Sequence, residues 1–194
     1  MDTLSDKVTV CIPTINSALT LNAVLESIAV QQILHLNVLI YDNGSVDGTP
    51  EMIRKQIENK WWKFIEIKLL ETTERSGGRV LNIPFMRHRL ALEAETEYIF
   101  FLDADVMIPP LALETVFNEF ENRKYIGMLG IRYEPMHDHV TMGATFMKTE
   151  VARKIKWTLT TDACECLNCI KDLQGLGLLS EYHPYLTARH IKFI

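Results

Sequence analysis

Short apolar runs alternate with stretches of helical periodicity up to about residue 121 of the chain. The apolar runs that predict β-strands are residues 8–12, 36–41, 64–70 and 98–102. Helices are predicted at residues 21–29, 49–60 and 113–120, and a further helix is predicted to end near residue 94. Strands that alternate with helices in this way are typical of a parallel sheet with helices on its faces.

The pattern changes in the second half of the chain, but no linker or repeat separates the halves. Strand-like runs lie at residues 126–131, 140–148, 178–182 and 185–193, and helical runs at residues 150–156 and 162–174. We therefore expect one α/β domain over residues 1–194, with two functional halves at about residues 8–121 and 122–194.

Composition and charge narrow the class of protein further. Hydrophobic residues make up 47% of the sequence, which is enough for a folded core. The 20 Lys and Arg residues against 25 Asp and Glu residues give a net charge of −5, so no nucleic-acid partner is expected. No secretory signal is visible at the N-terminus, and the apolar runs are too short to cross a bilayer. We expect a soluble, cytoplasmic protein.

Three of the four cysteines, Cys164, Cys166 and Cys169, have the spacing C-x-C-x-x-C. This spacing resembles part of a zinc site, but structural zinc usually takes four ligands from two separated pairs. No second pair exists in the sequence, so we expect reduced thiols on or near a helix.

Polar residues follow three of the predicted strands, at residues 13–16, 42–45 and 103–105. In an open parallel sheet, ligands bind beyond the carboxyl ends of the strands, so these groups should meet at one edge. Taken singly, Asp42 is equally well explained as a residue that forms a turn.

The pair Asp103 and Asp105 is more informative, because two carboxylates after a buried strand repel each other unless a cation or donor groups neutralise them. Mg²⁺ and Mn²⁺ prefer such oxygen ligands, commonly together with substrate phosphates. A helix N-terminus before Pro109 is the alternative, and it explains one acid better than two.

Four ordered elements resemble the family 2 glycosyltransferases, which have the GT-A fold and use nucleotide-sugar donors. They are residues 8–16 (a strand, then P-T-x-N), residues 38–49 (D-[DN]-G-S-x-D-G-T), Met86-Arg87-His88 (usually A-R-N) and residues 98–105 (a strand, then D-x-D). The resemblance implies a single GT-A-like domain with a mainly parallel twisted sheet. Its first half would be a Rossmann-like part that binds the nucleotide sugar, and its second half would face the acceptor.

The resemblance also implies roles for individual residues. Thr14 and Asp42 would contact the base and ribose, Arg79 or Arg75 the base or diphosphate, and Arg87 the donor sugar. For Arg75 we favour a solvated surface charge. The implied donor-binding set is Pro13, Thr14, Asn16, Asp42, Arg79, Arg87, Asp103 and Ala104. The implied ligands of a divalent metal (Mn²⁺ or Mg²⁺) are Asp103, Asp105 and His190.

The catalytic base is harder to assign, because the family's acceptor-side E-D motif is degraded here. Counting back from Gly177 favours Glu165, whereas the local Thr-Thr-Asp pattern favours Asp162, which is also placed to cap a helix. We choose Asp162 narrowly. In the same half, residues 142–148 resemble the family's small-residue strand that faces the donor sugar.

Other interpretations fit less well. Haloacid-dehalogenase-type phosphatases carry D-x-D on the first strand, and sugar-nucleotide pyrophosphorylases open with a Gly-rich basic motif. A non-catalytic module that binds nucleotide sugar or carbohydrate stays an alternative. We expect an inverting, metal-dependent glycosyltransferase that transfers a sugar to a hydroxyl of a glycan, protein or small-molecule acceptor.

Overall fold

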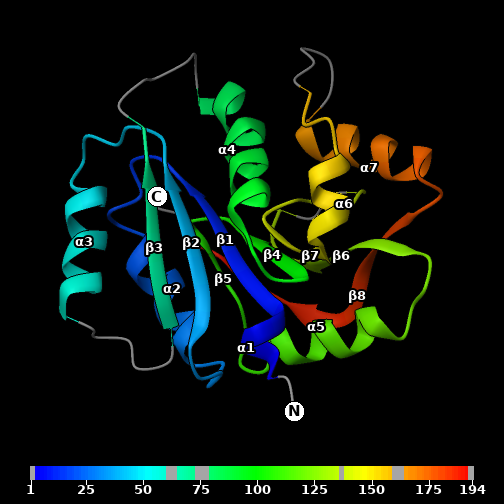
Figure 1. Cartoon of the computed structure of the whole chain (residues 1–194), viewed down its shortest axis with the longest axis horizontal. Coiled ribbons are helices and arrows are strands. Elements are labelled where there is room, and N and C mark those ends of the chain that lie inside the picture. Colours follow the sequence, from blue (N-terminus) through cyan, green and yellow to red (C-terminus); the bar gives the residue numbers. More distant parts are fainter. Residues whose placement is uncertain (1–2, 60–64, 73–78, 136–137, 159–163, 192–194) are drawn as a thin grey trace.

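The computed structural model describes residues 3–59, 65–72, 79–135, 138–158 and 164–191 (Figure 1). The helices in this part of the chain are α1 (Leu4–Lys7), α2 (Leu21–Ala29), α3 (Thr49–Asn59), α4 (Arg79–Glu93), α5 (Ala112–Glu121), α6 (Thr149–Lys154) and α7 (Glu165–Gly175). The strands are β1 (Val8–Thr14), β2 (Leu36–Asp42), β3 (Ile65–Glu71), β4 (Tyr98–Leu102), β5 (Val106–Met107), β6 (Ile126–Arg132), β7 (Ala144–Lys148), β8 (Leu179–Thr187) and β9 (Arg189–His190).

One mixed sheet of seven strands, in the order β3-β2-β1-β4-β7-β6-β8, organises the described part of the chain, and β5 pairs with β9 in a small second sheet. Only β7 runs antiparallel to its neighbours within the large sheet. The chain runs outward from β1 to β2 and β3, and it then returns to the other side of β1 to form β4. This reversal opens a crevice at the carboxyl ends of β1 and β4. The predicted mainly parallel α/β sheet is confirmed.

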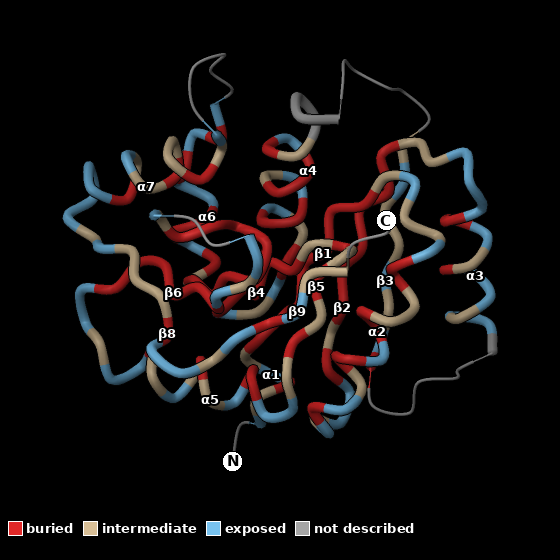
Figure 2. The backbone as a smooth tube through the Cα atoms, turned by 180° about the vertical axis from the view of Figure 1, so that it is seen from behind, coloured by how far each residue is buried: buried red, intermediate tan, exposed pale blue. Residues whose placement is uncertain are grey.

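Helices cover both faces of the sheet, and its central strands are buried (Figures 1 and 2). On one face, α2 and α5 pack against side chains that include Val10 and Ile12. On the other, α4, α6 and α7 pack against Cys11, Ile99 and Phe101. Successive side chains of a strand point to opposite faces, so a strand covered on both sides must be apolar throughout. This requirement explains the uninterrupted apolar run of β4.

Several element boundaries differ from the sequence prediction. β1 continues through Pro13, because the Thr14 carbonyl points to β2, where it accepts a hydrogen bond from the Asn43 N–H. The backbone of Pro13 therefore faces β4. The pairing of β1 with β4 already ends at Cys11, so the N–H group that proline lacks would have had no partner in the sheet.

In the second half, β7 is shorter than residues 140–148, and β8 runs unbroken through Pro184. A proline is tolerated there because β8 is an edge strand of the sheet. Helix α7 begins at Glu165 in the described residues, and the predicted start at Asp162 lies outside them.

Candidate functional site

A cavity of about 710 Å³ opens at the carboxyl edge of the sheet, beside the crevice between β1 and β4. Six of the residues predicted from the sequence line it, namely Pro13, Asn16, Asp103, Ala104, Asp105 and His190. Apolar side chains, such as Ile83 and Met86 of α4, complete much of the wall. A mostly apolar hollow of this size with a few convergent polar groups is typical of a small-molecule site.

Beside this cavity, the buried guanidinium of Arg87 joins two carboxylates. Arg87 Nη2 donates to Asp103 Oδ1 at 2.7 Å and lies 3.1 Å from Glu165 Oε1, and Arg87 Nε donates to the same Glu165 oxygen at 3.2 Å. Arg87 is 1% exposed and lies against the ring of Phe101. Arg87 lies in α4, Asp103 follows β4 and Glu165 begins α7. These three residues, the Arg87 triad, therefore fix three elements relative to one another.

The environment of Glu165 favours a proton-accepting role. Burial raises the pKa of the Glu165 carboxyl, and the opposing effect of Arg87 does not bring it back to its ordinary value. A carboxylate with a raised pKa is a stronger base than an exposed one, which suits general-base chemistry near neutral pH.

Four buried side-chain atoms have no hydrogen-bond partner among the described residues. They are Thr14 Oγ1, Asn43 Nδ2, Arg87 Nη1 and Glu165 Oε2. Buried polar atoms without partners cost about 1–3 kcal/mol each and are rare. All four belong to the carboxyl edge of the sheet or to the Arg87 triad, so a polar ligand bound there would offer them partners.

His190 and Asp105 form a second polar pair on the cavity wall. The pairing of β5 with β9 sets Val106 opposite His190, and His190 Nε2 lies 3.2 Å from Asp105 Oδ2. The other ring nitrogen, Nδ1, lies 3.0 Å from the carbonyl oxygen of Glu134, which can only accept a hydrogen bond. Nδ1 therefore carries the proton in neutral His190, which turns the Nε2 lone pair toward the carboxylate. A cation bound between Nε2 and the carboxylate would remove the repulsion between them.

Gly143 sits where no side chain fits, just before β7. A Cβ atom there would lie 2.1 Å from Tyr133 Oη and 2.5 Å from Asp103 Oδ2. The Gly143 carbonyl also accepts a hydrogen bond from the Asp103 N–H at 2.8 Å. The close approach of Gly143 therefore positions the first acid of D-x-D.

Asp42 shapes the turn after β2. It is 1% exposed, and its Oδ1 accepts hydrogen bonds from the N–H groups of Gly44 at 3.0 Å and Ser45 at 2.9 Å. Its Oδ2 accepts a hydrogen bond from the Ser45 hydroxyl. Asn16 ties the neighbouring loop to this turn, because its Oδ1 accepts a hydrogen bond from the Val46 N–H at 2.9 Å. The turn-forming role of Asp42 is thus visible, and a contact of Asp42 with a donor stays a prediction.

Three of the candidate residues cannot be placed in the site by their side chains. Arg79 is the first residue of α4, with only its backbone described, and Asp162 lies outside the described residues, as does Arg75. Sequence reasoning missed Tyr133, which lines the cavity, and Asn43. Asn43 stands next to Asp42 in the turn motif, so the signal was present, whereas nothing near Tyr133 marked it.

Comparison with known proteins is consistent with this geometry. The sequence model named Glycosyl transferase family 2 matches residues 9–167. A cholesterol galactosyltransferase of Borreliella burgdorferi is 30% identical over 112 residues, 58% of this chain and 28% of that protein. A teichoic acid poly(glycerol phosphate) polymerase of Staphylococcus epidermidis is 26% identical over 97% of this chain and 24% of its own length. This chain therefore spans about a quarter of these curated relatives.

Among solved structures, the mannosyltransferase PcManGT of Pyrobaculum calidifontis, in complex with GDP-Man and Mn²⁺, superposes with a TM-score of 0.78. The likeness covers 95% of this chain and 56% of that one at 19% identity, so it shows the fold alone. None of the helices in the described ranges is long and apolar enough to span a membrane. The family match covers most of the chain and contains all four motifs, which confirms the predicted resemblance: the chain belongs to glycosyl transferase family 2.

Proposed function

We propose that this chain is the catalytic domain of a glycosyltransferase that transfers a sugar from a nucleoside-diphosphate sugar to an acceptor hydroxyl. One observation carries the proposal most strongly. Asp103, held by Arg87, and Asp105, held by His190, line one wall of the cavity at the carboxyl edge of the sheet. Membership of the family and the nucleotide sugar in the mannosyltransferase complex support it.

Asp105 and His190 fit a divalent cation. An oxygen and an imidazole nitrogen 3.2 Å apart, with Nδ1 of the histidine tied to a carbonyl, form a suitable part of a Mn²⁺ or Mg²⁺ shell. When bound, such a cation neutralises the charge that develops on the departing nucleoside diphosphate. The proposed metal requirement rests on this pair and on Asp103 beside it.

Other residues at the carboxyl edge of the sheet would bind different parts of the donor. Thr14 and Asn43 have buried polar atoms that lack partners among the described residues, and they would bind the base or ribose of the nucleotide. Arg87 would bind the donor sugar through Nη1, since its other two nitrogens already hold Asp103 and Glu165. A planar, permanently charged guanidinium fixed on both sides orients a polar sugar well.

We assign the general base to Glu165, with Asp162 as the alternative that the sequence narrowly favoured. Glu165 shares an Arg87 nitrogen with Asp103, its pKa is raised by burial, and its Oε2 has no protein partner among the described residues. In the proposed reaction it accepts the proton of the acceptor hydroxyl as that oxygen attacks the anomeric carbon. A single displacement of this kind inverts the configuration at that carbon.

A donor screen tests the function. Calorimetry with UDP- and GDP-sugars, with Mn²⁺ or with chelator, should find one donor whose affinity depends on the metal. Transfer to candidate acceptors and the anomeric configuration of the product are then followed by NMR. If the chain binds a donor but neither transfers the sugar nor hydrolyses the donor, the non-catalytic binding module is favoured.

Paired variants separate the two candidate bases. Glu165→Gln should lower the transfer rate by about 10²–10⁴-fold, the usual effect of losing a general base, while donor affinity is retained. Asp162→Asn is the matched control three residues earlier and should keep transfer. The reverse result would move the base to Asp162, and full activity in both variants would refute a base at the start of α7.

A further inference from the structure

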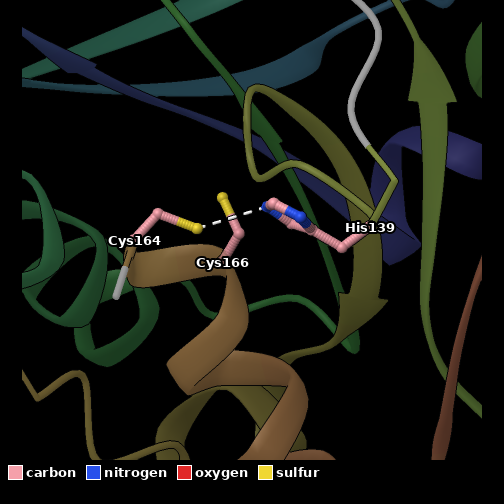
Figure 3. Close-up of side chains that lie close together, drawn as sticks. All are labelled: His139, Cys164 and Cys166. Carbon is pink, nitrogen blue, oxygen red and sulfur yellow. Dashed lines mark hydrogen bonds between the residues drawn. The ribbon is translucent and has the colours of Figure 1, made fainter. Parts of the chain in front are cut away.

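Away from the cavity wall, three side chains of types that can bind a metal converge between the loop before β7 and the start of α7 (Figure 3). Their ligand atoms, in His139, Cys164 and Cys166, all lie within 4.8 Å of one another. His139 Nε2 is 3.2 Å from Cys164 Sγ, although the two residues are 25 positions apart in the sequence. The nucleotide-sugar proposal uses none of these three residues.

The surroundings of His139 aim its ring at the sulfur atoms. Asp138 Oδ1 lies 2.8 Å from His139 Nδ1, and the Tyr182 hydroxyl donates to the His139 carbonyl at 2.7 Å. Histidines that bind metals commonly donate their other N–H to a carboxylate in this way, which fixes the ring and increases its basicity. These two contacts therefore hold His139 in an orientation that suits binding of a metal through Nε2.

The two cysteines sit at the first turn of α7. Cys164 is the N-cap residue and is exposed, whereas Cys166 is 9% exposed, and its thiol group forms a hydrogen bond with the backbone of Met142. Both are free thiols. An exposed Cys164 beside a largely buried Cys166 gives an ion a path from solvent into the cluster.

We propose that His139, Cys164 and Cys166 bind a Zn²⁺ ion, with water or a small exogenous ligand as the fourth ligand. Two sulfur ligands and one imidazole favour zinc over Mg²⁺ and Mn²⁺, which prefer oxygen. Each thiol releases its proton to solvent as the Zn–S bond forms. The C-x-C-x-x-C spacing alone does not reveal such a site, because the histidine ligand lies 25 residues upstream of Cys164.

Zinc at this position joins the two sides of the candidate active site. Glu165 lies between the two cysteines, and the loop that carries His139 leads directly to Gly143, whose carbonyl accepts a hydrogen bond from the Asp103 N–H. The ion would therefore hold the acceptor-side helix against the donor-side loop. We expect the reduced protein to melt at a higher temperature when zinc is added.

Cobalt titration of the reduced full chain, with excess Mg²⁺ to fill oxygen-rich sites, tests the proposal. Co²⁺ replaces zinc and gives a thiolate charge-transfer band in the near ultraviolet that carboxylate sites lack. The wild-type chain should show the band at one equivalent and lose it when zinc is added. Asp138→Asn should weaken zinc binding by about 10- to 100-fold.

Ligand variants decide the outcome. Cys164→Ser and His139→Gln should each weaken zinc binding by more than the Asp138 variant, and neither side chain lies in the apolar core. Cys169→Ala is the matched control, because this thiol lies on the same helix and contacts Met128 instead. Two results would overturn the proposal. One is the absence of the cobalt band in the reduced wild-type chain, and the other is a zinc affinity of Cys164→Ser or His139→Gln equal to that of the wild type.

Discussion

Replacing Arg87 by Met tests whether the guanidinium between Asp103 and Glu165 stabilises the fold as well as the site. Met has a similar apolar stem and can keep the contact with Phe101, but it removes two hydrogen bonds to carboxylates and the ion-pair contact between Nη2 and Glu165. Breaking a buried ion pair costs about 3–5 kcal/mol, because a charge is left without a partner. Asp103 is 31% exposed and water can solvate it, so we expect about 3 kcal/mol, at the lower end of that range. For a domain of this size, that loss corresponds to a fall in Tm of roughly 6–12 °C.

The pH dependence of the same variant gives an independent check. Burial raises the pKa of Glu165 and Arg87 opposes the increase, so the pKa of Glu165 should rise further without Arg87. A carboxyl whose pKa is higher in the folded state than in the unfolded state contributes stability at low pH and loses it as the pH rises through the folded-state pKa. The free energy of unfolding of Arg87→Met should therefore fall more steeply than that of the wild type as the pH rises above the ordinary pKa of a glutamate.

Urea denaturation at several pH values measures both effects. Arg89→Met is the control on the same helix, because Arg89 is 46% exposed and pairs with Glu93 at 3.7 Å; its effect should stay within about 0.5 kcal/mol. Adding Glu165→Gln to Arg87→Met should restore part of the loss. A loss below about 1 kcal/mol, or equal pH slopes in variant and wild type, would refute the reasoning.

Three further variants probe the candidate site. Asp105→Asn should remove the metal dependence of nucleotide binding without unfolding the chain, and equal nucleotide affinities of the wild type with metal and with chelator would contradict a metal there. Gly143→Ala should weaken donor binding, because the new Cβ overlaps Tyr133 Oη and Asp103 Oδ2, and adding Tyr133→Phe should recover part of the affinity measured by calorimetry. Asp42→Ala should raise the nucleotide Kd more than tenfold, as expected for the loss of a hydrogen bond to a charged group worth about 1.5–3 kcal/mol; an unchanged Kd would leave Asp42 as a turn former only.

The first half of the fold was readable because its signals are local. Three of its strands, β1, β2 and β4, are buried on both faces, so each appears as a mainly apolar run, and each ends in a polar turn. The position of His190 beside Asp105 was also expected, but only from the family resemblance. The β5–β9 pairing that produces it involves two residues in each strand, which is too short to leave a pattern in the sequence.

The second half was harder because its boundaries depend on tertiary contacts. β7 starts only at Ala144, although the hydrogen bond from the Asp103 N–H to the Gly143 carbonyl extends its pairing with β4 by one position. The approach of His139 to Cys164 spans 25 residues and two elements, and neither residue marks the other in the sequence. Spacing within one segment predicts a cluster only when the ligands share that segment.

The two open edges of the large sheet have a consequence for how the chain behaves at high concentration. An exposed strand edge offers unpaired backbone groups to another molecule, and proteins oppose such strand addition with charges, prolines and irregular register. β3 carries the exposed charges Glu66, Lys68 and Glu71 along one edge. β8 carries Pro184 on the other edge, and its register with β6 is interrupted twice. Edge-to-edge aggregation is thus opposed at both ends of the sheet, by charge at one and by backbone irregularity at the other.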